Sequence, residues 1–139
     1  RKNHITIWTG SEMLVWGGTD NSGVGFGDGG RYNPVTDSWL PLSATDAPSP
    51  RYSAGAVWTG VEMIVWGGAS GTTDLGDGGR YFPAQNAWAP LHGGPVASNS
   101  SAVWTGSRLL LWGGRSGSDG LSGLYAYKPI PPLVIYQKQ

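Results

Sequence analysis

The sequence contains no cysteine among its 139 residues. Disulfide frameworks, thiolate metal sites and cysteine nucleophiles are therefore excluded. Histidine is nearly absent as well, since only His4 and His92 are present and they lie far apart in the sequence. An imidazole metal site needs more ligands than this pair supplies. We expect no cofactor. Calcium at oxygen-rich loops such as 20–22 or 73–77 is a weak alternative, because such short segments do not supply the six or more oxygen ligands that Ca²⁺ takes.

Charge and long apolar runs are scarce too. Charged residues make up 13% of the chain and balance to a net charge of zero. A nucleic-acid binder would show a basic excess or a basic stripe, so we expect no nucleic-acid partner. No apolar run approaches the roughly 20 residues that a membrane-spanning helix needs. We therefore expect no membrane partner, and any signal peptide lies outside this chain.

Glycine and the large aromatic residues are abundant, with 24 Gly, 8 Trp and 6 Tyr. This aromatic content and the zero net charge argue against a disordered chain. The combination is typical of a fold in which backbones pass closely and flat side chains fill the gaps. At 139 residues we expect a single domain.

The chain is organised by a segment that occurs three times, beginning at Trp8, Trp58 and Trp104. Each copy runs from Trp-Thr-Gly through a short apolar stretch to Trp-Gly-Gly. The segment Gly-Asp-Gly-Gly-Arg-Tyr at 27–32 also returns at 76–81. A period close to 50 residues indicates a repeat architecture.

Each repeat predicts four short strands, and no segment has helical periodicity, so we expect an all-β fold. The first strands are predicted at 4–8, 54–58 and 100–104, the second at 13–16, 63–66 and 109–112, the third around Arg31-Tyr32, and the fourth at 38–42 and 87–91. The first and second strands are apolar on both faces, which predicts that other layers cover both faces. Pro41 and Pro90 predict that the fourth strand is an edge strand, because proline cannot donate to a ladder.

A glycine pair closes each second strand. These pairs are Gly17 and Gly18, Gly67 and Gly68, and Gly113 and Gly114. A phosphate cradle would require a following helix and a Lys-Ser/Thr, which are missing. We interpret the pairs instead as structural, allowing close backbone approach beneath an aromatic ring.

The double glycine, the tyrosine of the third strand and Trp39 or Trp88 of the fourth together resemble kelch repeats, in particular those of bacterial, exported proteins. The resemblance implies three four-stranded blades of a β-propeller, at approximately 1–47, 48–96 and 97–139, and a secreted, periplasmic or cell-surface location. The third repeat departs from the pattern, because Ser-Gly-Leu-Tyr-Ala-Tyr at 122–127 replaces the glycine-rich motif and 133–138 has no tryptophan.

Three blades are too few for a closed propeller, which usually has about four to eight. Two interpretations remain open. Two copies of the chain could close a homodimeric ring of six blades, or the chain could be the C-terminal half of a longer propeller or an engineered half. Arg1 aligns with Arg51 at a blade boundary, which favours three whole blades and the homodimer.

The long loops 19–27, 43–52, 69–76, 92–98 and 115–122 are expected on one face of the propeller, where a ligand would bind. The candidate ligand-binding residues on it are His4, Asp20, Asn21, Arg51, Tyr52, Asp74, Arg115 and Asp119. Solvated loop polarity explains these residues equally well. Arg31 and Arg80 recur with Asp28 and Asp77, and residues repeated in every blade predict structural hydrogen bonds and salt bridges.

We predict no catalytic residues, because no nucleophile with a paired base is evident. The favoured function is a non-catalytic module that binds a protein or a glycan. The alternatives are a purely structural or engineered half-propeller and, less favoured, a carbohydrate-active or other hydrolase or lyase.

Overall fold

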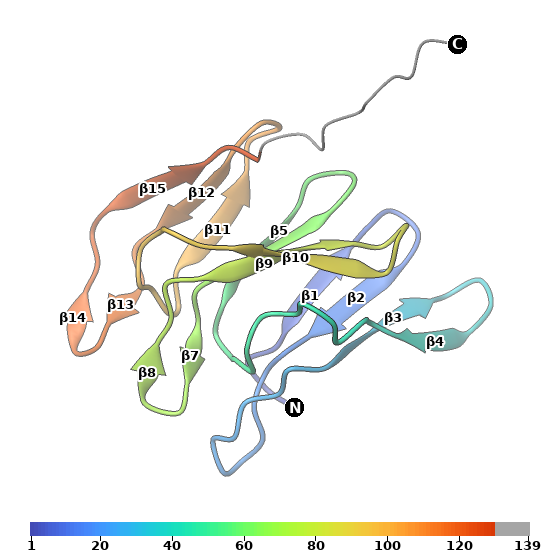
Figure 1. Ribbon diagram of the computed structural model, residues 1–139, viewed down its shortest axis with the longest axis horizontal. Helices are drawn as coiled ribbons and strands as arrows, with labels where there is room; N and C mark the ends of the chain where they lie inside the picture. The colour runs from blue at the N-terminus through green and yellow to red at the C-terminus, as the bar shows by residue number, and fades with distance from the viewer. Residues whose placement is uncertain (130–139) are drawn as a thin grey trace.

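Residues 1–129 are described by the structure, a computed structural model, and they form an all-β chain (Figure 1). No helix within this range is long and apolar enough to cross a membrane. Three antiparallel sheets follow one another along the chain, and two short ribbons project from the connections within the second and third sheets.

The first sheet is a meander, a sheet in which each strand pairs with the next along the chain. Its strands are β1 (Ile5–Trp8), β2 (Met13–Trp16), β3 (Gly29–Asn33) and β4 (Ser38–Pro41), in the order β1-β2-β3-β4. The second sheet repeats it with β5 (Gly55–Trp58), β6 (Met63–Trp66), β9 (Gly78–Phe82) and β10 (Ala87–Leu91). Pro41 and Pro90 lie in the edge strands β4 and β10, as the sequence predicts.

The third sheet has three strands among the described residues. They are β11 (Ser101–Trp104), β12 (Leu109–Trp112) and β15 (Leu124–Tyr127), with β12 in the middle. The strand-like segment 133–138 lies outside the described residues. The strands of the three sheets fall within the predicted segments 1–47, 48–96 and 97–139.

Two of the predicted long loops contain short ribbons instead of irregular chain. Segment 69–76 holds β7 (Ala69–Ser70) paired with β8 (Thr73–Asp74), and segment 115–122 holds β13 (Arg115–Ser116) paired with β14 (Asp119–Gly120). A tight turn at Gly71 and another at Gly117, with φ of +60° and +64°, let the chain fold back so soon.

The first hairpin of each sheet has the tight turn that the Thr-Gly segment predicts. In the first sheet the amide of Thr9 donates to the carbonyl of Glu12 over 3.0 Å, and the Thr9 hydroxyl oxygen accepts the amide of Glu12 over 2.9 Å. Gly10 takes a φ of +104°, a conformation that costs a residue with a Cβ atom free energy. The turns at Thr59 and Thr105 repeat the main-chain bond.

The sheets lie side by side through their first strands, with β1 beside β5 and β5 beside β11. A first core fills the space between the first and second sheets and contains Trp16 and Trp88, whose ring centroids are 5.3 Å apart. A second core lies between the second and third sheets and contains Trp66 and Leu109. The second sheet is therefore covered on both faces.

This arrangement corrects the expectation that every first and second strand is covered on both faces. The prediction fits β6, in which all four residues are buried. It is wrong for the outer faces of the first and third sheets, where Trp8 and Trp112 are more than half exposed. Strand composition shows what a face is able to pack against, whereas the covering layer comes from a neighbouring sheet.

The glycine pairs do permit close backbone approach, but to backbone rather than to an aromatic ring. A Cβ atom on Gly17 would lie 2.8 Å from the carbonyl oxygen of Arg51, and one on Gly18 would lie 2.9 Å from that of Lys2. The amide of Gly18 donates to the Arg51 carbonyl over 2.9 Å. The second pair behaves in the same way, with Gly67 against the carbonyl of Ala97 in the following connection and Gly68 against that of Tyr52 in the preceding one.

Candidate functional site

One edge of the molecule carries the long connections, and the opposite edge carries the tight hairpin turns (Figure 1). Main-chain hydrogen bonds hold the connections together on that edge. The amide of Gly68 donates to the Ala97 carbonyl over 2.8 Å, and the amide of Ala97 donates to the Leu75 carbonyl over 3.1 Å. The segment that leads into the third sheet thus packs on the loop of the second, as the repeat predicts. We refer to this side as the loop edge.

The first loop is ordered by the carboxylate of Asp20. Its Oδ1 atom accepts hydrogen bonds from the amide of Ser22 over 2.8 Å, the hydroxyl of Ser22 over 2.7 Å and the amide of Val24 over 3.1 Å. The Ser22 hydroxyl is the main reason why the pKa of Asp20 lies below its usual value. Asn21 beside it is exposed, so this loop presents a pre-formed polar turn to solvent.

Asp74 joins the second loop to the third. Its Oδ2 atom accepts the amide of Gly117 over 2.6 Å, and its Oδ1 atom lies 4.0 Å from Nε of Arg115. Arg115 also donates to the Ser98 hydroxyl over 3.2 Å. Asp119 is exposed on the same ribbon as Arg115. Asp74 and Arg115 are thus two candidate residues that the fold brings into contact.

Arg51, another candidate, is buried with only 1% of its surface exposed. Its guanidinium donates to the carbonyl of Gly67, to the hydroxyl of Ser49 and to both the carbonyl and the carboxylate of Asp77. These bonds occupy the guanidinium inside the protein, so Arg51 holds the loop in place and does not face solvent. We therefore leave it out of the ligand surface.

The first sheet repeats this contact through Arg1, which donates to the carbonyl of Gly17 and to Asp28 over 3.0 Å. The third sheet has neither the arginine nor the aspartate. In the alignment of the repeats, Ala97 is equivalent to Arg51 and Gly123 is equivalent to Asp28. The carbonyl of Gly123 still accepts the amide of Gly113 over 3.4 Å. The arginine and the aspartate are thus absent together, which supports a structural role for the pair.

The two remaining candidates lie apart from these contacts. His4 is exposed in the connection before β1 and touches the first glycine pair, since a Cβ atom on Gly18 would meet its side chain at 2.8 Å. Tyr52 donates its hydroxyl to the carbonyl of Gly71 and so holds the turn between β7 and β8. The eight candidates are therefore spread along the loop edge rather than gathered in one pocket.

Arg31 and Arg80 pair with glutamates that the sequence analysis did not single out. Arg80 makes a bidentate pair with Glu62, over 2.7 Å from Nε and 2.9 Å from Nη2, and Glu62 is nearly fully buried. The hydrogen bonds that Arg80 donates to Glu62 raise the pKa of Arg80. Arg31 lies 3.9 Å from Glu12, the equivalent residue of the first sheet. The aspartates of the repeated motif pair instead with Arg1 and Arg51.

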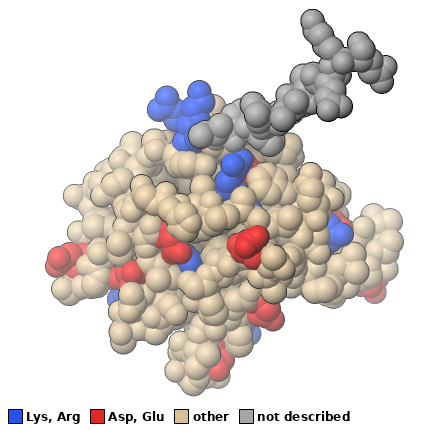
Figure 2. Space-filling model, viewed as in Figure 1, with Lys and Arg blue, Asp and Glu red and all other residues tan. Residues whose placement is uncertain are grey.

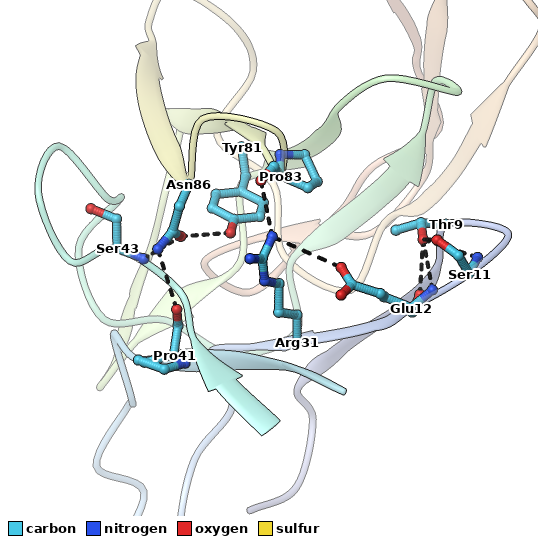
Figure 3. A network of polar contacts seen from close by, with 9 residues as sticks. All are labelled: Thr9, Ser11, Glu12, Arg31, Pro41, Ser43, Tyr81, Pro83 and Asn86. Carbon is cyan, nitrogen blue, oxygen red and sulfur yellow. Dashed lines mark hydrogen bonds and ion pairs between the residues drawn. The ribbon is translucent and has the colours of Figure 1, made fainter. Parts of the chain in front are cut away.

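A polar network joins the first sheet to the second (Figure 3). Nη1 of Arg31 donates to the carbonyl of Pro83 over 3.0 Å. The Oδ1 atom of Asn86 accepts the hydroxyl of Tyr81 over 2.7 Å and the amide of Ser43 over 2.9 Å. Asn86 was not among the predicted residues, because the only feature that distinguishes it in the sequence is its place in the turn after the repeated tyrosine.

A cavity of about 190 Å³ lies between the second and third sheets. Trp66, Leu111 and Tyr125 contribute aromatic and aliphatic walls, and His92 lies at its rim in the connection after β10. The indole of Trp66 donates to the Pro95 carbonyl over 2.9 Å. The cavity occupies the side of the second sheet opposite to the one that Trp88 fills.

Charged side chains are thinly scattered over the face shown in Figure 2, with acidic and basic groups interspersed. Within residues 1–129 no three His, Asp or Glu side chains lie together as a metal site would require. A scan against protein-family models finds no match, and neither does a search of the curated proteins. The resemblance to kelch repeats thus stays a prediction from the motifs.

Proposed function

We propose that the chain comprises three blades of an exported, kelch-type β-propeller that serves as a non-catalytic binding module for a protein or a glycan. Two observations support the propeller. Each sheet begins with the same hairpin, and the first strands β1, β5 and β11 lie beside one another. Meander sheets arranged around their first strands are the architecture of propeller blades.

The proposed binding function rests on the difference between the two edges of the molecule. The edge opposite to the loops carries four-residue turns such as Thr9–Glu12, each closed by a main-chain hydrogen bond. On the loop edge, Asp20 and Asp74 order the loops and leave Asn21, Asp119 and part of Arg115 exposed. Ordered loops lose less conformational entropy when they bind, so the free energy of their contacts is retained as affinity.

A hydrolase or lyase is disfavoured by the arrangement of the ionisable groups. Arg51, Arg80 and Glu62 are committed to bonds inside the protein. The partly buried carboxylate of Asp20 and the exposed carboxylate of Asp119 lie on different loops. General acid–base chemistry needs groups that converge on one reacting atom. The structural alternative, a half-propeller with no ligand of its own, is the outcome against which the binding module is tested.

The test is a titration of the ¹⁵N-labelled protein, followed by amide chemical shifts. The probes are a panel of soluble oligosaccharides and peptides selected by phage display on the intact protein. We expect shifts at 20–25, 70–74 and 116–120, and weaker binding after Asn21→Ala or Asp119→Ala. Ser11→Ala and Ser107→Ala on the opposite turns are the matched controls and should bind as the unmodified protein does.

A panel in which no probe binds would favour the purely structural alternative. Shifts confined to the turns at 9–12, 59–62 and 105–108 would place binding on the wrong edge and contradict the proposal.

A further inference from the structure

The first and third sheets each have one apolar face that no other part of residues 1–129 covers. On the first sheet this face carries Trp8 and Trp39, which are 55% and 54% exposed. On the third sheet it carries Val103, Trp112 and Leu124, with Trp112 56% exposed. We call these the leading face, of residues Trp8, Met13, Tyr32 and Trp39, and the trailing face, of residues Val103, Leu110 and Trp112.

The interface between the first and second sheets shows how two such faces fit together. The second sheet contributes Trp58, Met63, Tyr81 and Trp88, and the first sheet contributes Ile7, Leu14 and Trp16. In this contact Trp16 is fully buried and Trp88 is 6% exposed. The indole of Trp88 also donates to the Ser43 carbonyl of the first sheet over 3.0 Å.

The two outer faces repeat the two sides of this interface position by position. The strand registers place Trp8, Met13, Tyr32 and Trp39 where the second sheet has Trp58, Met63, Tyr81 and Trp88. The same registers place Val103, Leu110 and Trp112 where the first sheet has Ile7, Leu14 and Trp16. The leading face therefore has the same residue types as the side that the second sheet contributes to this interface. The trailing face has nearly the same residue types as the side that the first sheet contributes.

Charged residues at the two faces are complementary as well. Inside the chain, Arg31 of the first sheet lies between Glu12 and the Pro83 carbonyl of the second. The trailing side has Arg108 at the position of Glu12, and the leading side has Asp37 at the position of Asn86; both are exposed. The two faces thus carry exposed charges of opposite sign.

We propose that the leading face of one chain packs on the trailing face of a second copy, with Trp39 against Trp112. This rests on the proposed blade arrangement. The contact continues the interface between the first and second sheets from one chain to the next. Made at both ends of two copies, it closes a two-fold ring of six sheets and buries apolar faces that a soluble monomer rarely exposes.

The experiment uses opposite charges on the two faces. Each of the two contacts in the dimer joins Trp39 of one chain to Trp112 of the other. Either substitution alone, Trp39→Lys or Trp112→Glu, therefore disrupts both contacts. We expect both variants to sediment as single chains. A one-to-one mixture should recover the dimer mass, since one contact then joins Lys to Glu and the other joins the unmodified tryptophans. Val61→Lys, at an exposed turn position, is the control and should stay dimeric.

The proposal is overturned if either single variant keeps the mass of the unmodified protein, or if the mixture stays monomeric. A mass that grows without limit with concentration would also overturn the closed ring. Circular dichroism of each variant verifies folding, and ¹⁹F spectra of 5-fluorotryptophan protein report directly whether Trp39 and Trp112 leave solvent. The amide titration, repeated on monomeric Trp39→Lys, separates the two proposals, because loop-edge shifts that persist there leave the binding function standing whatever the assembly.

Discussion

The first and second sheets have nearly the same sequence and very different surroundings. Trp39 and Trp88 occupy equivalent positions in β4 and β10, yet the first is 54% exposed and the second 6%. The two ion pairs also differ, although each faces a neighbouring sheet: Glu12 and Arg31 lie 3.9 Å apart, whereas Glu62 and Arg80 make two hydrogen bonds of 2.7 and 2.9 Å. Within residues 1–129 the second sheet has a neighbouring sheet on each face, whereas the first has one on a single face.

This difference teaches that the repeated residues are suited to an interface and take part in it only where the partner sheet is present. Burial lowers the local dielectric, so removing one partner of an ion pair costs more free energy where water is excluded, because the other charge is left buried without compensation. The first sheet therefore serves as an internal control for the second, and paired substitutions at equivalent positions measure what a neighbouring sheet adds.

The largest effect is expected at the tryptophans. Trp88→Ala should lower the free energy of unfolding by about 3–5 kcal/mol, because it removes a buried side chain packed between Trp16 and Tyr81. Trp39→Ala should cost a single chain less than about 1 kcal/mol and act instead through assembly. Denaturant unfolding at several protein concentrations distinguishes them, since only the Trp39→Ala effect should depend on concentration. Equal, concentration-independent losses would contradict the comparison.

The ion pairs come next. Glu62→Ala leaves the largely buried Arg80 without its bidentate partner and should cost about 3 kcal/mol. Glu12→Ala breaks a longer, partly solvated pair and should cost less than about 1 kcal/mol. Thermal unfolding of the two variants measures the difference. If Glu12→Ala were as damaging as Glu62→Ala, the shorter and more buried geometry would not be what strengthens the pair.

A smaller effect is expected at the turn before the fourth strand. Asn86→Ala removes the acceptor for Tyr81 and Ser43 and should cost about 1–3 kcal/mol. Asp37→Ala removes only an exposed bond from Tyr32 and should cost less than about 1 kcal/mol. The φ angles of Asn86 and Asp37 are +48° and +49°, so the backbone cost of alanine cancels in the comparison. A reversed order of the two variants would contradict the assignment.

The smallest effect is a loss of stability in alkali. Burial raises the pKa of Tyr81, so the folded state prefers the neutral phenol more than the unfolded state does. The contribution is fully present below the unfolded value of 10.0 and is lost as the pH rises through the higher folded pKa. Unfolding measured from about pH 8 to about pH 11 should show this decline, and Tyr81→Phe should flatten it. A decline unchanged in Tyr81→Phe would assign it to other groups.

Much of the fold follows from the repeated segment. The second strands begin and end where predicted, at 13–16, 63–66 and 109–112. The first strands differ from the prediction by one residue, because the residue before each one lies in the connection. The ribbons β7–β8 and β13–β14 could not be predicted, since strands of two residues are too short to show an alternation of apolar and polar residues.

The candidate site was harder to predict because alignment shows which positions are equivalent but not what their side chains touch. Arg51 is polar and lies in a loop, yet Asp77 and Gly67 retain it inside the protein. Glu62 was overlooked because a turn glutamate is ordinarily solvated, and only the fold brings Arg80 to it. Such partners are distant in sequence, so no local pattern identifies them.

The most direct test of the account is the mass of the unmodified protein in solution, measured by sedimentation equilibrium over a range of concentrations. If the leading and trailing faces pair as proposed, the mass approaches that of two chains and Trp39 is protected from a solvent quencher. A mass of one chain at every concentration, with Trp39 and Trp112 both open to the quencher, would contradict the account.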